Sequence, residues 1–295
     1  MSRPNFNCVA IIGVGLIGGS FGMALKKHRL AGSVIGIGRN PDRLQRAVEL
    51  GAIDRWSLDA SAGVRGADLI YIATPVGLEL DFVQRVLPSA KPGCIITDAG
   101  STKAEICRGA DVLVKDRAAF VGGHPMAGSE AAGVEAARAD LFEDTTYVLT
   151  PTVHTDSEAL EKMHHIVEGI GARPLAMDPE IHDRCAAVIS HLPHVIAAGL
   201  TLLAQEESAA NPQVLELVAG SFRDMTRVAG SPPVLWRDIC LTNTKAIKDA
   251  VDEFRRLIDQ AVALMEGGDA QALEDWFGAA KIVRDTRLPP DDRGA

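Results

Sequence analysis

The chain has 295 residues, of which 47% are hydrophobic and 23% charged, a globular composition with room for two domains. Its formal net charge of -9 disfavours nucleic acid as a partner, because an acidic surface repels phosphate backbones. The five cysteines form no CxxC pair, no long apolar run indicates a membrane span, and no signal peptide is evident. We therefore expect a cytoplasmic protein with reduced thiols and no membrane partner.

Strands and helices alternate through the first part of the chain. The expected strands lie at residues 8–12, 34–37, 68–73, 94–98, 120–121, 147–150 and 174–177, and the expected helices at 20–27, 41–50, from 102 towards 111, and 155–170. Asn40 suits the start of the second helix, and Thr102 with Glu105 and Thr155 with Glu158 predict capping boxes for the next two. This alternation predicts an α/β Rossmann domain over residues 1–178, with a doubly wound, mostly parallel sheet.

The pattern changes after residue 178. Apolar residues recur at helical spacing from Ile181 to Leu203, residues 239–265 and 270–283 also have helical patterns, and no further strand is indicated. We expect an all-α domain over residues 179–287, whose large apolar faces predict a homodimer packed through helices. Residues 288–295 are polar and contain prolines, and are expected to form a flexible tail.

The segment from Gly13 to Gly18 has the GxGxxG spacing of a dinucleotide-binding turn, between an expected strand and an expected helix. Gly13 permits the tight turn, Gly15 lets the backbone approach a pyrophosphate, and Gly18 lets the helix pack against the strand. A glycine turn without a ligand is the alternative. The cofactor-binding residues expected near the sheet edge are Gly13, Gly15, Leu16, Ile17, Gly18, Thr74 and Pro75.

The end of the second strand favours NADP. NAD sites usually carry an acid here that holds the ribose hydroxyls, whereas this chain has Gly38 followed by Arg39. A small residue beside an arginine can accommodate the 2′-phosphate of NADP. We expect Arg39 to bind this phosphate, with NAD as the alternative if Arg39 stacks on adenine or is only solvated.

Titratable residues in three segments are candidates for the chemistry. His124 lies in a loop of small residues, and a histidine suits proton removal from an alcohol, although a lone histidine is more often structural. His191 and His194 share a helix face as pocket or core residues, and no neighbouring acid or cysteine motif completes a metal site, so we expect no metal. The arginines and aspartates of residues 223–238 suit either a carboxylate clamp or a helix interface.

Together, these motifs resemble the prephenate/arogenate dehydrogenase family over nearly the whole chain. The resemblance rests on GVGLIGGS from Gly13, DAGSTK from Asp98, GGHPMAGSE from Gly122, ISHLPH from Ile189, FRDMTR from Phe222 and WRDI from Trp236. Their shared order is more specific than any one motif. It implies a Rossmann domain followed by a helical dimerisation domain, in agreement with the patterns above.

The resemblance implies oxidative decarboxylation of prephenate or arogenate, with hydride transfer to NAD or NADP, in tyrosine biosynthesis. It further implies that His124 accepts the proton of the ring hydroxyl, that Ser101 contacts that hydroxyl, and that Arg227 binds a substrate carboxylate. The other implied pocket residues are His191, His194, Trp236, Glu130 and Asp224, the last two as acids that shape or gate the pocket. Gly38 departs from the acid that the family often has.

Two other functions are compatible with a dinucleotide-binding domain followed by helices. A β-hydroxyacid dehydrogenase or an imine reductase has a similar layout, but Lys245 and Lys248 lack the glycines that surround the catalytic lysine of the hydroxyacid enzymes. A non-catalytic nicotinamide-binding sensor would have lost the base, whereas His124, Ser101 and Arg227 are all present. The sequence leaves prephenate and arogenate equally open. We expect no further regulatory domain, and we therefore expect any tyrosine inhibition to act at the active site.

Overall fold

The computed structural model describes residues 5–115, 117–128 and 131–287. It separates into two compact units, Met1–Ala246 and Ile247–Ala295. The first unit holds the whole sheet and the helices up to α11 (Pro233–Thr242). The second holds most of α12 (Thr244–Gly267) and all of α13 (Ala270–Arg287). The boundary expected near residue 178 marks a change of secondary structure, and as a division into domains it stays a prediction.

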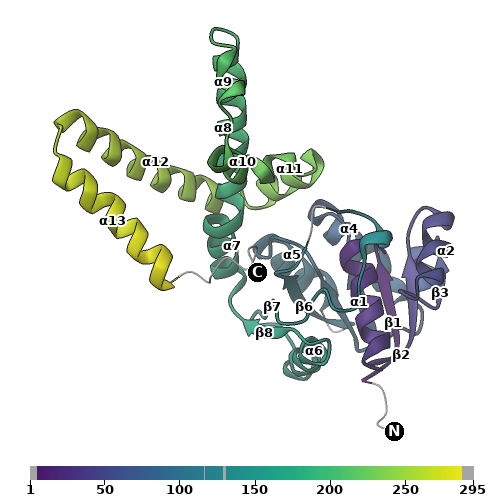
Figure 1. Ribbon diagram of the computed structural model, residues 1–295. Helices are drawn as coiled ribbons and strands as arrows, with labels where there is room; N and C mark the ends of the chain where they lie inside the picture. The colour runs from purple at the N-terminus through teal and green to yellow at the C-terminus, as the bar shows by residue number, and fades with distance from the viewer. Residues whose placement is uncertain (1–4, 116, 129–130, 288–295) are drawn as a thin grey trace. The chain divides into compact units, whose positions relative to one another are not determined.

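The described residues form one eight-stranded sheet in the order β3-β2-β1-β4-β5-β6-β7-β8 (Figure 1). Neighbouring strands are parallel except for β6 and β7, which pair antiparallel. The expected mostly parallel sheet is therefore confirmed. The strands are β1 (Phe6–Ile12), β2 (Ala31–Ile37), β3 (Arg55–Ser57), β4 (Leu69–Ile72), β5 (Cys94–Asp98), β6 (Ala118–Pro125), β7 (Thr146–Thr150) and β8 (Arg173–Ala176).

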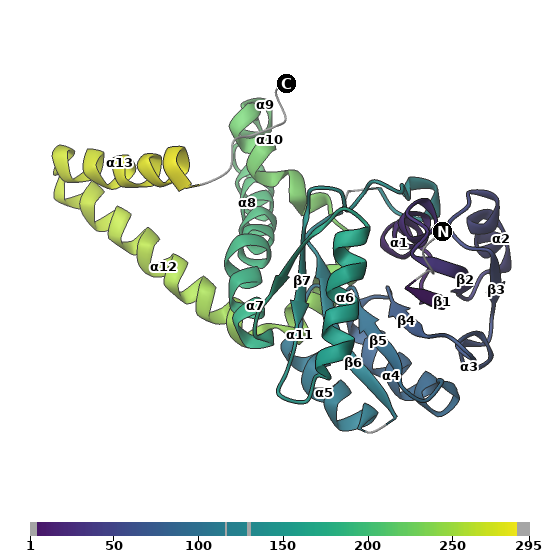
Figure 2. The ribbon, with the colours of Figure 1, turned by 90° about the horizontal axis from the view of Figure 1, so that it is seen from below.

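Helices cover both faces of this sheet (Figure 2). Strand residues alternate between two cores: Val9 and Ile11 pack with α1, α2 and α6, whereas Ala10 and Ile12 pack with α3, α4 and α5. Burial on both faces explains why the strands are continuously apolar in sequence. The helices are α1 (Leu16–Lys27), α2 (Pro41–Glu49), α3 (Ala60–Gly63), α4 (Glu79–Val86), α5 (Ala104–Val114) and α6 (Ser157–Gly169).

From Pro179 to Arg287 the described residues form helices and no strand. The stretch expected as one helix over residues 239–265 is two helices that are separated at Asn243. The elements are α7 (Pro179–Ala186), the π-turn η4 (Ala187–His191), α8 (Leu192–Ser208), α9 (Gln213–Glu216), α10 (Gly220–Thr226), the 3-10 turn η5 (Arg227–Gly230), α11 (Pro233–Thr242), α12 (Thr244–Gly267) and α13 (Ala270–Arg287).

Of the three helix N-caps predicted from the sequence, the structure confirms one. Asn40 caps α2 as expected, because its side chain accepts from the amide of Arg43 at 3.0 Å. The cap of α6 is Asp156, one residue after the expected Thr155. No capping box forms at Thr102, because the first amides of α5 are satisfied by the carboxylate of Asp183 from α7.

The helical run Pro179–Ser208 is apolar on its outer side. It is long and apolar enough to cross a membrane by length and composition alone, and 28% of its most apolar window is buried. The residues that define its apolar spacing include Ile181, Val188 and Ile189, which are 44%, 57% and 66% exposed. The buried residues of α7 are Pro179, His182, Asp183 and Ala186, so the side that meets the rest of this unit includes two polar side chains.

Candidate active site

The glycine turn has the close packing that its spacing predicts. Gly13 has a φ of +91°, and a β-carbon there would overlap the carbonyl of Ala73 at the end of β4. A β-carbon on Gly18 would overlap the carbonyl of Gly13. Gly15 has open space around it, as a backbone needs for a ligand to approach. Helix α1 begins at Leu16, earlier than the expected residue 20, so its free amides point towards this space.

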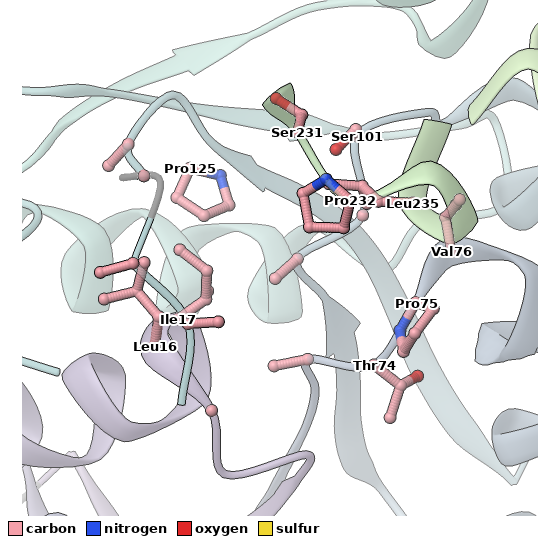
Figure 3. A pocket seen from close by; sticks show the side chains of 18 of the residues that line it. Leu16, Ile17, Thr74, Pro75, Val76, Ser101, Pro125, Ser231, Pro232 and Leu235 are labelled. Carbon is pink, nitrogen blue, oxygen red and sulfur yellow. The ribbon is translucent and has the colours of Figure 1, made fainter. Parts of the chain in front are cut away.

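A cavity of about 920 Å³ opens beside this turn, outside the carboxyl ends of β1, β4, β5 and β6. Figure 3 shows Leu16 and Ile17 on one side of it, Thr74 and Pro75 on another, and Pro232 of the segment before α11 above them. Ligands of open α/β sheets bind at this edge, where the strand order reverses. The cavity therefore joins the expected cofactor turn to the helices that follow the sheet.

Most of the residues expected to act on cofactor or substrate meet in this cavity. Its lining includes Gly15, Leu16, Ile17, Thr74, Pro75, Ser101, His124, His194 and Arg227. Gly13 and Gly18 do not line the cavity but permit the close packing of the turn beside it. Arg39 and Asp224 are exposed and do not line the cavity, and Glu130 lies outside the described residues. The functional roles assigned to all of these residues stay predictions.

His124 sits near the end of β6 and faces the cavity. Its Nδ1 lies 2.8 Å from Nε2 of His182, and Nδ1 of His182 lies 2.8 Å from Oδ1 of Asp183. Desolvation by burial is the main cause that holds the pKa of His124 well below 6.5, and the ammonium group of Lys103 adds to it. The ring is therefore neutral at physiological pH and can accept a proton.

A buried charged cluster lies under the loop that carries Ser101. Lys103 forms an ion pair with Asp98, both being fully buried, and Asp98 also accepts from the amides of Gly100 and Gly123 at 2.8 and 3.0 Å. Burial by itself would lower the pKa of Lys103, but the buried carboxylate of Asp98 outweighs it and raises that pKa. Asp98 thereby links the Ser101 loop to the strand that bears His124.

The two histidines of the helical part have different surroundings. His194 stacks on Trp236 with ring centroids 3.6 Å apart, and its Nδ1 lies 2.9 Å from the carbonyl of Ser190. His191 is 1% exposed, and its Nδ1 lies 3.2 Å from Nδ2 of Asn243. Their ring nitrogens thus have separate partners, and no group of three or more metal-ligating side chains occurs in the described part of the chain.

Pro193 explains how these histidines reach the site. A proline inside a helix removes one hydrogen bond and crowds the preceding turn. The chain responds with the π-turn η4, directly before α8, and such turns accommodate a local break in a continuous helix. The break at this proline takes the form of a wider turn, with His191 buried and His194 lining the cavity.

Sequence reasoning missed four polar residues around the site: His182, Asp183, Asn243 and Glu79. His182 and Asp183 could not be identified from periodicity, because the apolar spacing that begins at Ile181 marks the opposite, exposed face of α7. A His-Asp pair shortly after the Asp178-Pro179 helix start was the only signal available. Glu79 gave no signal, because an acid in the first turn of a helix is ordinarily a solvated residue.

The comparisons with known proteins cover nearly the whole chain. Residues 21–175 match the family model described as prephenate dehydrogenase, nucleotide-binding domain, and residues 178–279 match prephenate dehydrogenase, dimerization domain. The prephenate dehydrogenase of Bacillus subtilis is 41% identical over 288 residues, which are 97% of this chain and 77% of that protein.

Solved structures agree with the sequence matches. The prephenate dehydrogenase from Aquifex aeolicus, in complex with hydroxyphenyl propionate and NAD+, has a TM-score of 0.89 and 31% identity, covering 94% of this chain and 97% of that one. The Synechocystis arogenate dehydrogenase has a TM-score of 0.84 and 30% identity, covering 95% of this chain and 100% of that one. The chain is therefore an oxidoreductase that belongs to the prephenate dehydrogenase family.

Proposed function

We propose that this chain catalyses the oxidative decarboxylation of prephenate or arogenate with a nicotinamide cofactor, in tyrosine biosynthesis. The observation that supports this best is a shared cavity: Ser101, His124 and Arg227 line the same space as the glycine turn. Relatives named for prephenate and for arogenate match nearly the whole chain. Both substrates are therefore retained as candidates.

The residues of the turn fit a dinucleotide. Gly13 and Gly18 leave no room for a β-carbon, whereas Gly15 leaves its side of the turn open. Backbone amides at the start of α1 would hold the pyrophosphate, with Leu16, Ile17, Thr74 and Pro75 along the cavity wall. When bound, the nicotinamide ring supplies the acceptor for a hydride. We propose NADP as the preferred form, because Gly38 stands where an acid would disfavour the 2′-phosphate and Arg39 follows it.

His124 acts as the base in this proposal. The C4 hydroxyl of the cyclohexadiene ring gives its proton to His124 as hydride leaves C4, and Ser101 holds the same hydroxyl. The C1 carboxylate leaves as carbon dioxide, and its electron pair enters the ring, which becomes aromatic with a phenolate oxygen at C4. His124 returns the proton to this oxygen and is neutral again. Aromatisation drives the step, so the protein has to position groups and accept a proton.

Anion binding is assigned to the helical side of the cavity. Arg227 is proposed to bind a substrate carboxylate, since a guanidinium can hold one through two parallel hydrogen bonds. His194 lines the cavity, with Trp236 stacked behind it and His191 buried beside that indole. Asp224 and Glu130 are proposed as acids that shape or gate the entrance.

The match to a dimerization domain suggests a homodimer. Exposed apolar residues on the run from Ile181 to Leu203 support this assignment. We propose further that the enzyme is cytoplasmic and that tyrosine, if it inhibits, competes for the substrate pocket. A tyrosine titration in which prephenate fails to relieve the inhibition would reject that last point.

Initial velocities with prephenate and arogenate, each paired with NAD and NADP, test the function. Formation of reduced cofactor in any pairing supports the assigned reaction, and the best pairing identifies substrate and cofactor together. Folded protein that binds a dinucleotide but turns over none of the pairings would reject the reaction and favour a sensor.

A further inference from the structure

The side chain of His124 is the first member of a hydrogen-bonded row. Nδ1 of His124 lies 2.8 Å from Nε2 of His182, whose Nδ1 lies 2.8 Å from Oδ1 of Asp183. His182 and Asp183 are 2% and 3% exposed. The row therefore begins at the cavity and continues into the protein, where water does not compete for its hydrogen bonds.

The chemistry of the row determines where its protons lie. A carboxylate only accepts, so Nδ1 of His182 carries the hydrogen that faces Asp183. In a neutral His182 ring, Nε2 then carries none and accepts from Nδ1 of His124. This leaves Nε2 of His124 as its unprotonated nitrogen. A histidine held in this form presents one basic atom, in the way that a buried aspartate fixes the histidine of a hydrolase triad.

Asp183 is itself held in place by helix α5. Its Oδ1 accepts from the amide of Lys103 at 2.7 Å, and its Oδ2 accepts from the amide of Ala104 at 2.9 Å. The positive end of the α5 dipole stabilises a carboxylate at this position. Because Lys103 follows closely after Ser101, the same carboxylate that orients His182 also anchors the loop that carries Ser101.

Helix α7 supplies both polar residues to the row because of how it starts. Asp178 accepts from the amides of Glu180 and Ile181 at 2.8 and 3.0 Å, and Pro179 occupies the first turn. Asn243 donates to the carbonyl of Asp183 at 2.9 Å. Helix α7 is thus held by hydrogen bonds at its N-terminus and again at Asp183, which keeps His182 within hydrogen-bond distance of His124.

We propose that His182 is a positioning residue for the reaction assigned above: it holds His124 in the Nδ1–H form, with Nε2 turned to the substrate hydroxyl. This inference rests on the proposed function, because it takes His124 as the base. After proton transfer, the imidazolium of His124 still donates to His182, and the carboxylate of Asp183 beyond it favours that charge. The proton then returns through Nε2 to the phenolate oxygen of the product.

Two substitutions separate positioning from packing. His182→Phe fills the space but cannot accept from His124, so we expect kcat to fall by about 100-fold, with the cofactor KM unchanged. His182→Gln can accept through its carbonyl and donate through its amide, so we expect it to recover most of kcat. The matched controls are His154→Phe and His154→Gln, at an exposed histidine of this unit, and these should behave as the wild type.

Nitrogen-15 NMR of the histidine rings gives a readout that does not depend on turnover. We expect the wild type and His182→Gln to show His124 protonated at Nδ1, and His182→Phe to show a mixture of both tautomers. Wild-type kcat and an unchanged tautomer in folded His182→Phe would overturn the inference, as would His124 found protonated at Nε2 in the wild type. A silent wild-type enzyme would instead count against the proposed function.

Discussion

The carboxyl group of Glu79 lies directly beneath the backbone of Gly100. A β-carbon placed on Gly100 would come within 2.5 Å of Oε2 and 2.7 Å of Oε1 of Glu79. Glu79 is fully buried, and the carboxylate of Asp98 lies beside it. Burial, and then the nearby Asp98, raise the pKa of Glu79 well above 4.5, so the loop that carries Ser101 rests on a neutral acid.

Glu79→Gln is expected to be tolerated, because an amide has nearly the shape of the protonated acid and no charge. Glu79→Ala removes the support beneath Gly100 and leaves a cavity, so it should cost about 2–4 kcal/mol of unfolding free energy and lower kcat as well. Thermal unfolding and turnover of the two variants measure this. Equal destabilisation by Gln and Ala would mean that Glu79 is ionised in the folded protein.

Gly100→Ala tests the same contact between Gly100 and Glu79 from the side of the glycine. The new methyl group cannot fit over the carboxyl of Glu79 unless the loop shifts, and a shift of Ser101 should lower kcat by about 10-fold or more. Gly128→Ala is the control, since a β-carbon at that residue of the cavity lining meets nothing within 4 Å. Steady-state kinetics of the two variants would show whether the close approach matters, and equal kcat values would argue that it does not.

The pH dependence of turnover should reflect the low pKa of His124. Protonated His124 cannot accept the hydroxyl proton, so activity rises with pH through its pKa, which lies well below 6.5. The profile of log kcat/KM should therefore be flat at neutral pH and fall only in more acidic buffer. A fall centred at or above pH 6.5 would contradict the desolvated environment of this ring.

The strands and the glycine turn could be predicted because their causes are local. A short apolar run such as Val9–Ile12, followed directly by a glycine turn, predicts a buried strand, and Gly13 needs its positive φ because of a turn only a few residues long. The row through His182 could not be predicted, since it depends on α7 packing against the start of α5, about 80 residues away in sequence. The same contact explains why the capping box expected at Thr102 was wrong.

The apolar stripe that begins at Ile181 was expected to pack in a homodimer, and it is exposed on this single chain. Periodicity identifies an apolar stripe, but it does not say whether that stripe meets the same chain or a second one. Here Ile181 and Ile189 point outward and His182 inward. A stripe that stays exposed on one subunit is the pattern expected of a surface that associates, and the match to a dimerization domain over residues 178–279 agrees with this explanation.

Cofactor preference can be tested at the end of β2. Arg39→Ala should raise KM for NADP by about 10-fold or more and leave KM for NAD nearly unchanged, because a charged hydrogen bond to the 2′-phosphate is lost. Gly38→Asp should move the preference towards NAD, since a carboxylate binds the ribose hydroxyls and repels the phosphate. Arg43→Ala, on α2 and also exposed, is the control. Equal effects of Arg39→Ala on both cofactors would argue for adenine stacking instead.

His191 should make the fold sensitive to acid. Desolvation lowers the pKa of this buried ring from 6.5 to about 4. As pH falls below 6.5, His191 is therefore protonated in the unfolded chain but stays neutral in the native protein. The free energy of unfolding therefore decreases through this window, by up to about 3 kcal/mol from this group. In His191→Gln, the loss of melting temperature between neutral pH and about pH 5 should be smaller than in the wild type. His154→Gln, at an exposed position, should keep the wild-type loss. An unchanged acid sensitivity in His191→Gln would show that His191 is protonated in the folded protein without penalty.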